Sequence, residues 1–327
     1  MNQARDVKTG QIIEAETLKY IYEEGLSKYQ CTDDTCKIGL TPCSYKPFNK
    51  NRPYFKSVRG ASHSKTCTFS EYLKLLEKGK KRKLAEVELE DMPFPTKLRK
   101  VNKKEVDNIQ YKLEPNTSKE DKSGKVRSKS SGEFEETRNR SKVVNSLSSI
   151  VDFYIKCPFN RDVELEIEHK KQEYMYWFKR ISKPKRLGNY KGKKIFFGRL
   201  HTDKSKIEDT DTKINITMYE CEGWEEVETT RKTQKKRKSQ VNPFVITIDK
   251  SKLSKHKVSR IINEIDYAIE EKILAFKDKT EEEKKDAYVF FYGVAPKRKE
   301  PYTFSVNDGI LVARYCRIMQ TQLKQGN

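Results

Sequence analysis

Four residues near the N-terminus have the types and spacing of a metal site. Cys31 and Cys36 form a C-x4-C pair, and after a long gap His63 and Cys67 form an H-x3-C pair. Zinc prefers a tetrahedron of thiolate and imidazole ligands, and ligands paired in sequence lose less entropy when the site assembles. Three cysteines and one histidine fill every position, so the pattern predicts a structural Zn²⁺ site. Cys43 lies between the two pairs and is an alternative ligand.

A second arrangement has the order of a metal-dependent nuclease site. Asp152 precedes Glu168-His169-Lys170, and in an Asp…E-x-K site the carboxylates hold Mg²⁺ while the lysine assists the attack. In a chain with 36% charged residues such a match is common, and Glu270-Glu271-Lys272 and Glu282-Glu283-Lys284 fit equally well. A nuclease that uses Asp152, Glu168 and Lys170 is therefore an alternative hypothesis, and no spacing ties a cysteine to a histidine for nucleophilic catalysis.

The charge balance indicates a polyanionic partner. Lysine and arginine number 69 against 48 aspartates and glutamates, a formal net charge of +21. Such a field favours nucleic acid, DNA or RNA, and basic tracts bind phosphates by releasing counterions without choosing a sequence. An acidic protein partner is the alternative. The two basic tracts are Lys80, Lys81, Arg82, Lys83 and Arg231, Lys232, Lys235, Lys236, Arg237, Lys238.

Hydropathy and cysteine usage indicate a cytoplasmic protein. No run approaches the roughly 18 apolar residues that a membrane span needs, and residues 1–6 show no apolar signal core. We therefore expect no membrane partner. In a reducing compartment the seven cysteines are thiols or metal ligands rather than a disulfide framework.

Composition divides the chain into three parts. Residues 1–78 read as a small zinc-binding module, with a hairpin turning at Thr9-Gly10 and a helix that begins after Cys67 and ends at Gly79. Residues 79–148 read as a basic, largely disordered linker, since residues 112–146 are poor in apolar side chains. Residues 149–327 regain apolar periodicity and read as a C-terminal α+β domain.

Alternating apolar residues predict most elements of that domain. An amphipathic repeat over 258–276 predicts one long helix. Few strand–helix–strand crossovers occur, which favours α+β with a mainly antiparallel sheet. The predicted strands are 150–155, 164–168, 195–198, 214–218, 244–248, 288–294, 303–306 and 309–313.

Aromatic residues recur in these segments. Of two adjacent aromatics on a strand, one points inward, so core packing accounts for most of them, and the outward one of Phe196-Phe197 or Phe290-Phe291 is a candidate for base stacking. The full set is Phe153, Tyr154, Phe196, Phe197, Phe290, Phe291 and Tyr292.

The residues around the cysteines resemble a known family. Ala4-x-Asp6-x-x-Thr9-Gly10 precedes the first cysteine pair and Arg52-Pro53-Tyr54-Phe55 precedes His63. This pattern, over residues 4–67, resembles the N-terminal zinc finger of the competence protein CoiA-like family. The resemblance implies the four ligands given above, a bacterial or mobile-element origin, and nucleic-acid handling, because in that family the finger accompanies a nuclease-like domain. The wider cysteine spacing and the linker and C-terminal domain depart from it.

These observations together favour a non-enzymatic nucleic-acid-binding protein with a structural zinc site. The alternatives are a metal-dependent nuclease or nuclease accessory of the CoiA type, and a protein-interaction adaptor of a phage-defence or mobile-element locus.

Overall fold

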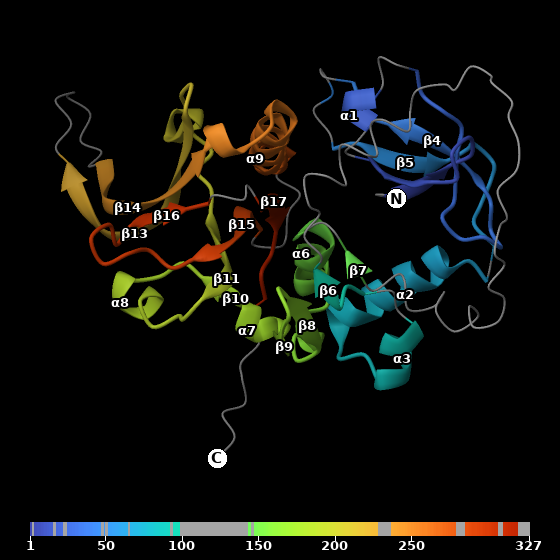
Figure 1. Ribbon diagram of the computed structural model, residues 1–327, viewed down its shortest axis with the longest axis horizontal. Helices are drawn as coiled ribbons and strands as arrows, with labels where there is room; N and C mark the ends of the chain where they lie inside the picture. The colour runs from blue at the N-terminus through green and yellow to red at the C-terminus, as the bar shows by residue number, and fades with distance from the viewer. Residues whose placement is uncertain are drawn as a thin grey trace, which may run out of the picture.

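The computed structural model is α+β, as the sequence predicts, and its described sheets are mainly antiparallel (Figure 1). Most of the predicted linker, residues 99–142 and 145–146, lies outside the described residues. Among the residues described, no helix combines the length and apolar character needed to cross a membrane. The structure describes residues 1, 3–15, 18–21, 25–46, 49, 52–64, 66–91, 94–98, 143–144, 147–227, 237–278, 285–306 and 310–319.

The N-terminal part is a five-stranded sheet in the order β2-β1-β3-β4-β5. The predicted hairpin is present, since β1 pairs antiparallel with β2 and Gly10, in its turn, has a φ of 69° that glycine adopts readily. The sheet packs its own apolar cluster around Leu18, Tyr29 and Phe55. The elements are β1 (Gln3–Asp6), β2 (Ile12–Glu14), α1 (Leu18–Ile21), β3 (Tyr29–Gln30), β4 (Gly39–Cys43) and β5 (Tyr54–Ser57).

Helices and a small sheet follow. The helix predicted after Cys67 is α2 (Thr68–Lys81). It continues past Gly79 because Gly79 is buried against α6, where an added Cβ would lie 2.8 Å from the Cys157 sulfur. The remaining elements here are α3 (Glu86–Asp91), β6 (Lys97–Leu98), β7 (Val143–Val144), α6 (Leu147–Lys156), η4 (Pro158–Asn160), β8 (Glu164–Ile167) and β9 (Lys170–Glu173), with sheet order β7-β6-β8-β9.

The prediction of a strand at 150–155 is wrong, because this segment lies within helix α6. Leu147, Ile150, Val151 and Tyr154 are buried on one helical face, and a short apolar run cannot be assigned to strand or helix from periodicity alone.

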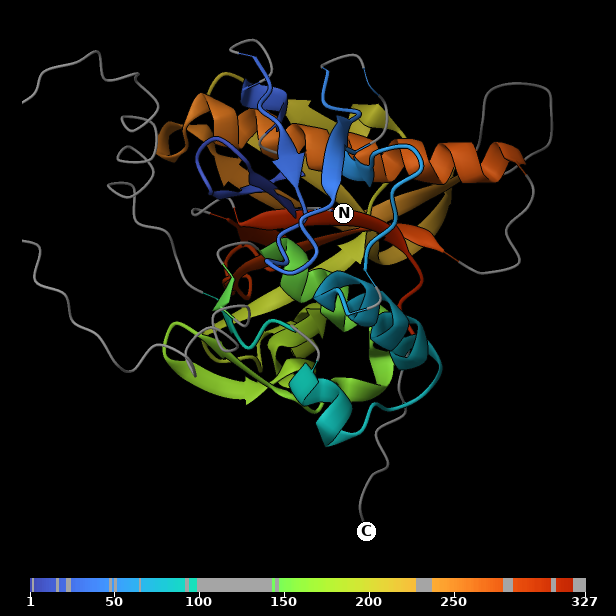
Figure 2. The same cartoon turned by 90° about the vertical axis from the view of Figure 1, so that its right-hand side faces the viewer.

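Two four-stranded sheets and one long helix complete the fold. The sheets have the orders β10-β11-β15-β17 and β12-β13-β14-β16. The predicted long helix is α9 (Lys255–Asp278), and in Figures 1 and 2 it lies between the N-terminal sheet and the β15–β17 sheet. The other elements are α7 (Tyr174–Trp177), β10 (Phe178–Arg180), α8 (Pro184–Leu187), β11 (Lys193–Arg199), η5 (Lys204–Lys206), β12 (Ile207–Asp209), β13 (Lys213–Val227), β14 (Arg237–Asp249), η6 (Lys250–Lys252), β15 (Asp286–Val294), β16 (Thr303–Ser305) and β17 (Leu311–Cys316).

The sheet β10-β11-β15-β17 is covered on both faces. Phe197 and Phe290 pack in one apolar cluster with α2 and α6, and Phe196 and Phe291 pack in another with β13, β14 and α9. Neither member of either pair is exposed, so the prediction of an outward, base-stacking phenylalanine is wrong. The reason is that a second layer covers each face, which the sequence of one strand does not reveal.

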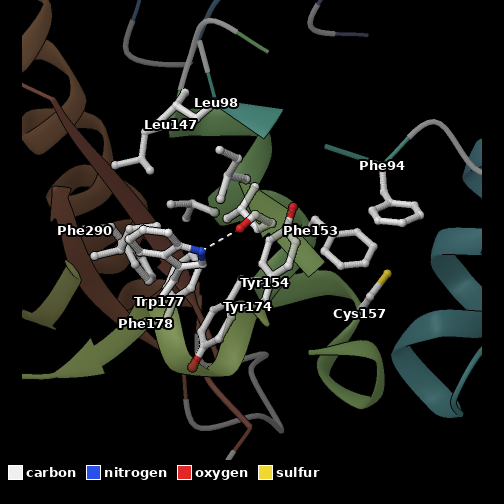
Figure 3. Close-up of a cluster of buried hydrophobic side chains, with 14 of the residues drawn as sticks. Phe94, Leu98, Leu147, Phe153, Tyr154, Cys157, Tyr174, Trp177, Phe178 and Phe290 are labelled. Atoms are coloured by element: carbon white, nitrogen blue, oxygen red, sulfur yellow. Dashed lines mark hydrogen bonds between the residues drawn. The ribbon is translucent and has the colours of Figure 1, made fainter. Parts of the chain in front are cut away.

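The first of these clusters joins distant parts of the chain. Leu75 and Leu76 of α2 pack in it together with residues of α6, β8 and α7. Figure 3 shows Trp177 beside Phe178 and Phe290 in this cluster, where its indole N–H donates to the Leu165 carbonyl at 2.8 Å. Helix α2 thus links the segment that carries Cys67 to the main body.

Candidate metal centre and basic surfaces

The first cysteine pair lies in a tight turn between β3 and β4. Cys31 follows β3 directly, and its backbone N–H donates to the Ile38 carbonyl at 2.8 Å, which closes the turn. Lys37, directly after the second cysteine, has a φ of 43°, a left-handed conformation that reverses the chain. The four residues between the cysteines form this turn, which explains why a C-x4-C spacing works here.

The second pair is held by the approach to α2. His63 lies in the segment after β5, and Cys67 is the N-cap of α2, with extended backbone angles of −66° and 124°. The Cys67 carbonyl accepts the first helical hydrogen bonds, from Ser70 and Glu71. The start of the helix therefore fixes the direction of the Cys67 side chain.

The four donor atoms converge. Those of Cys31, Cys36, His63 and Cys67 all lie within 4.8 Å of one another. The sulfurs of Cys31 and Cys67 are 3.7 Å apart, and His63 Nδ1 lies 3.4 Å from the Cys36 sulfur and 3.4 Å from the Cys67 sulfur. With Zn–S near 2.3 Å and Zn–N near 2.0–2.1 Å, a regular tetrahedron places two sulfurs about 3.8 Å apart and sulfur and nitrogen about 3.5 Å apart. This cluster could hold a metal ion.

Backbone amides point at the sulfurs. The Asp33 amide donates to the Cys31 sulfur, and the Phe69 and Ser70 amides donate to that of Cys67. The Cys36 sulfur accepts from the amides of Ile38 and Ser64. Such bonds stabilise thiolates, the form that binds metal, and second-shell donors of this kind orient ligands. The donor set and its surroundings therefore fit a closed thiolate–imidazole site.

Burial acts on the ligands in the opposite direction. It raises the pKa of Cys31 to about 12 and lowers the pKa of His63 by disfavouring the imidazolium. A neutral imidazole is the ligand form, and a bound cation would supply the charge that a buried thiolate lacks.

Asp33 joins the two ligand pairs, a role that the sequence did not indicate. Its carboxylate accepts from the Thr35 amide at 2.8 Å and the Cys36 amide at 3.2 Å. Its other oxygen accepts from the amide of Thr68, the first residue of α2, at 2.7 Å. Despite partial burial, these hydrogen bonds hold the pKa of the Asp33 carboxyl below its ordinary value. Asp33, which lies in the turn between β3 and β4, thus caps helix α2, the helix that begins directly after Cys67.

Cys43 is not a member of the cluster. It ends β4, where its thiol donates to the Thr41 carbonyl at 3.6 Å. The alternative ligand set with Cys43 is therefore not the one that the fold assembles.

The two carboxylates of the nuclease alternative are placed apart. Asp152 is partly buried on α6 and pairs with Arg314 at 2.9 Å. Glu168 lies in the β8–β9 turn with a φ of 51°, where it pairs with Lys193 and accepts from Tyr292 Oη at 3.0 Å. Arg314 stands opposite Tyr288 on the sheet, four residues from Tyr292, or about 13 Å along the strand. Asp152 and Glu168 therefore serve different ion pairs.

The structure describes the two predicted basic tracts to different extents. In the first, Lys80 pairs with Glu77 at 2.5 Å, Arg82 with Glu88 at 2.7 Å, and Lys83 with Asp162. No carboxylate partner of Lys81 occurs among the residues described. Part of this tract is therefore occupied in local ion pairs at the end of α2. In the second tract, residues 231–236 lie outside the described residues, and only the backbone of Arg237 and Lys238 is placed, in β14.

A stronger basic feature lies elsewhere, and the sequence analysis missed it. A pocket of about 390 Å³ is lined by five lysines with Gln172 and Trp177, and no acidic side chain lines it. These lysines come from β9, from the start of β11 and from the loop just before β11, about twenty residues apart in sequence, so only the fold brings them together. We refer to this feature as the lysine pocket, and its lysines are Lys170, Lys171, Lys191, Lys193 and Lys194.

Neighbouring positive charges act on Lys194 in the lysine pocket. The pKa of Lys194 is lowered by burial and then by the charges of Lys179 and Lys170. Lys194 donates to Gln172 at 2.9 Å and lies 5.3 Å from the centre of the Trp177 ring. Lys170, proposed above as a catalytic lysine, belongs to this pocket. Such a cluster of like charges is suited to binding an anion.

Comparisons with protein-family models, with curated proteins and with solved structures give no match for this chain. The CoiA-like resemblance of residues 4–67 therefore stays a prediction.

Proposed function

We propose that this protein binds nucleic acid through phosphate contacts and is not an enzyme, and that Zn²⁺ occupies the Cys31, Cys36, His63 and Cys67 cluster as a structural ion. The observation that carries the proposal is the lysine pocket, whose lining contains five lysines and no acidic side chain, and in which only Lys193 has a carboxylate partner, Glu168, among the ion pairs described. In the unbound protein the ammonium groups of neighbouring lysines repel one another, and bound phosphate oxygens would reduce that repulsion.

The zinc proposal rests on the donor chemistry. Three cysteines and one histidine suit zinc over magnesium or calcium, which prefer oxygen ligands. Four protein ligands leave no position for a substrate or a water, so the ion would hold β3, β4 and α2 together rather than perform chemistry. The amides that donate to the sulfurs support the same role.

The nuclease alternative receives no comparable support. Its two carboxylates are each engaged by a cationic side chain, Asp152 by Arg314 and Glu168 by Lys193. The adaptor alternative remains as an outcome of the binding experiment below, since an acidic protein surface would also suit the lysine pocket.

The test is a salt series with labelled single-stranded and duplex oligonucleotides, DNA and RNA, of one length. We expect log K to fall linearly with log salt, and the Lys170→Gln/Lys171→Gln variant to flatten the slope by up to about 1.4 for single strands and about 1.8 for duplex DNA. The matched control is Lys8→Gln/Lys56→Gln, which removes the same charge from exposed positions of the N-terminal sheet.

Equal slopes in the two double variants would refute the role of the lysine pocket. Absence of binding at low salt, together with a stable complex with an acidic protein, would replace the proposal by the adaptor function. Zinc is tested by metal analysis of the purified protein, where we expect one equivalent, and Cys31→Ser should abolish it. Less than about half an equivalent, unchanged by Cys31→Ser, would end the zinc proposal.

A further inference from the structure

A second hollow, about 560 Å³ in volume, combines exposed aromatic rings with cationic side chains. Residues of β10, α8, β11, β13 and β14 line it, and we call it the aromatic groove. Trp224 and Tyr219 are 44% and 37% exposed, unusual for large rings on a sheet. Their centroids lie 5.2 Å apart at an interplanar angle of 49°.

A β-bulge places the Tyr219 ring. The register of β13 against β14 shifts between Thr217 and Cys221, and a bulge re-aims the side chains of the strand that carries it. Gln240 of β14 holds the bulge by donating to the carbonyls of Met218 and Tyr219, both at 3.0 Å. The exposure of Tyr219 is therefore built into the backbone rather than being a surface accident.

The charge of the aromatic groove is positive. Its acidic residue, Glu220, is occupied by Arg199, whose side chain and backbone amide both donate to it, at 3.0 and 2.7 Å. The Arg199 guanidinium also lies 4.2 Å from the centre of the Tyr219 ring. Arg180, Lys183 and Arg186 also line the groove, and among the residues described no carboxylate pairs with these three.

The aromatic groove and the lysine pocket are connected. Strand β11 begins with Lys193 and Lys194 in the lysine pocket and ends with Arg199 in the aromatic groove, a span of roughly 20 Å. Lys179 lies between the two. Burial is the main cause of the lowered pKa of Lys194, and the positive charge of Lys179 is the next. The Lys179 ammonium also lies 5.3 Å from the centre of the Tyr190 ring, which lines the groove.

We propose that the aromatic groove binds unstacked bases of a single-stranded nucleic acid, with Trp224 and Tyr219 as stacking surfaces and Arg180, Lys183 and Arg186 as phosphate contacts. Exposed rings beside cations are the features that single-strand binding uses, and a duplex, whose bases are already stacked, cannot use the rings. The track from the lysine pocket to the groove accommodates about three to six nucleotides. This inference deepens the proposed function and rests on it.

The experiment compares Trp224→Ala, Trp224→Phe and Phe276→Ala, the last a control that removes an 88% exposed ring from α9. Single-strand and duplex oligonucleotides of equal length are titrated against each by fluorescence anisotropy at one salt concentration. We expect Trp224→Ala to weaken single-strand binding roughly 5- to 150-fold and to leave duplex binding unchanged. Trp224→Phe should retain most of the affinity, and Phe276→Ala all of it.

Intrinsic fluorescence gives a second readout. The chain has two tryptophans, and Trp177 is 1% exposed, so quenching by a single strand should come from Trp224 and disappear in Trp224→Phe. Thermal unfolding of each variant verifies that the fold is intact.

The outcomes separate this inference from the proposed function. Salt-dependent binding in which Trp224→Ala behaves like wild type on single strands would overturn the inference and leave the proposed function standing. Absence of salt-dependent binding to any oligonucleotide would overturn both. Binding of polyglutamate that is lost in Trp224→Ala, without oligonucleotide binding, would reassign the groove to an acidic protein partner.

Discussion

The Asp33 carboxylate gives the sharpest test of the metal centre, because it connects the two halves of the ligand set without being a ligand. It accepts from the Cys36 amide at 3.2 Å and from the Thr68 amide at 2.7 Å. The first bond orients one ligand, and the second ties the turn to the helix that follows Cys67. We expect Asp33→Ala to weaken metal binding while all four ligands remain.

The magnitude follows from these two bonds. A hydrogen bond to a charged group contributes about 1.5–3 kcal/mol when buried. Because Asp33 is partly exposed and Thr68 is exposed, we reduce this to about 1 kcal/mol for each bond. A total of about 2 kcal/mol corresponds to about a 30-fold loss of zinc affinity, within the 10- to 100-fold range typical of second-shell partners.

The neighbouring residue is the matched control. Asp34 is 84% exposed in its side chain and pairs only with Arg5 among the interactions described, so Asp34→Ala removes the same charge from the same turn. Zinc affinity is measured by competition with a chromophoric chelator at pH 7. If Asp33→Ala and Asp34→Ala change the affinity equally, the argument for Asp33 as a link between the ligand pairs fails.

Three further predictions concern side-chain contacts of helices α9, α2 and α6. Arg52→Ala should lower the free energy of unfolding by about 2–4 kcal/mol in urea titrations, because it leaves the buried Glu264 with one cationic partner fewer; an unchanged midpoint would contradict this. Gly79→Ala should lower the free energy of unfolding by about 1–3 kcal/mol, because the added methyl group clashes with Cys157. A glycine-to-alanine change inside a helix usually raises the stability by roughly 1 kcal/mol instead. Adding Cys157→Ala should remove the clash and restore the stability. Burial opposes ionisation of Asp152, but the positive charges around it, Arg314 first and then Lys156, together outweigh burial and lower the carboxyl pKa. The stability difference between wild type and Asp152→Asn should therefore be full at neutral pH and shrink below about pH 4. A difference that is constant from pH 7 to pH 3 would refute that assignment.

Local sequence patterns predicted the elements whose signal is local. The ligand spacing identified the cluster of Cys31, Cys36, His63 and Cys67, and strict alternation predicted strands such as β13 and β14. The repeat of three and four residues predicted α9 over most of its length. In each case one face of the element is apolar and the other polar, and that contrast is visible without knowing the partner.

The features missed are those that depend on residues far apart. Helix α6 was mistaken for a strand because its apolar run is short. Phe196 and Phe290 are buried because separate layers cover the two faces of their sheet. The link between Asp33 and Thr68 spans 35 residues. The lysine pocket also requires β9 to meet the start of β11, which no local pattern indicates.

The position of the cluster of Cys31, Cys36, His63 and Cys67 indicates that a bound ion would stabilise the fold rather than contact nucleic acid. It lies where β3, β4 and the start of α2 meet, and the later residues Leu75 and Leu76 of α2 pack in the core that contains Trp177. A second connection, from Arg52 to Glu264 and to the Ala313 carbonyl, joins the N-terminal sheet to α9 and β17. The lysine pocket and the aromatic groove are lined by other elements, β9 to β11, α8, β13 and β14. Because the residues of the cluster form neither the second connection nor the lining of the lysine pocket and the aromatic groove, we expect a chelator to raise protease sensitivity within residues 1–67 first. Single-strand affinity should fall less than it does in Trp224→Ala, and a larger fall on chelation would instead place the metal module in direct contact with the nucleic acid.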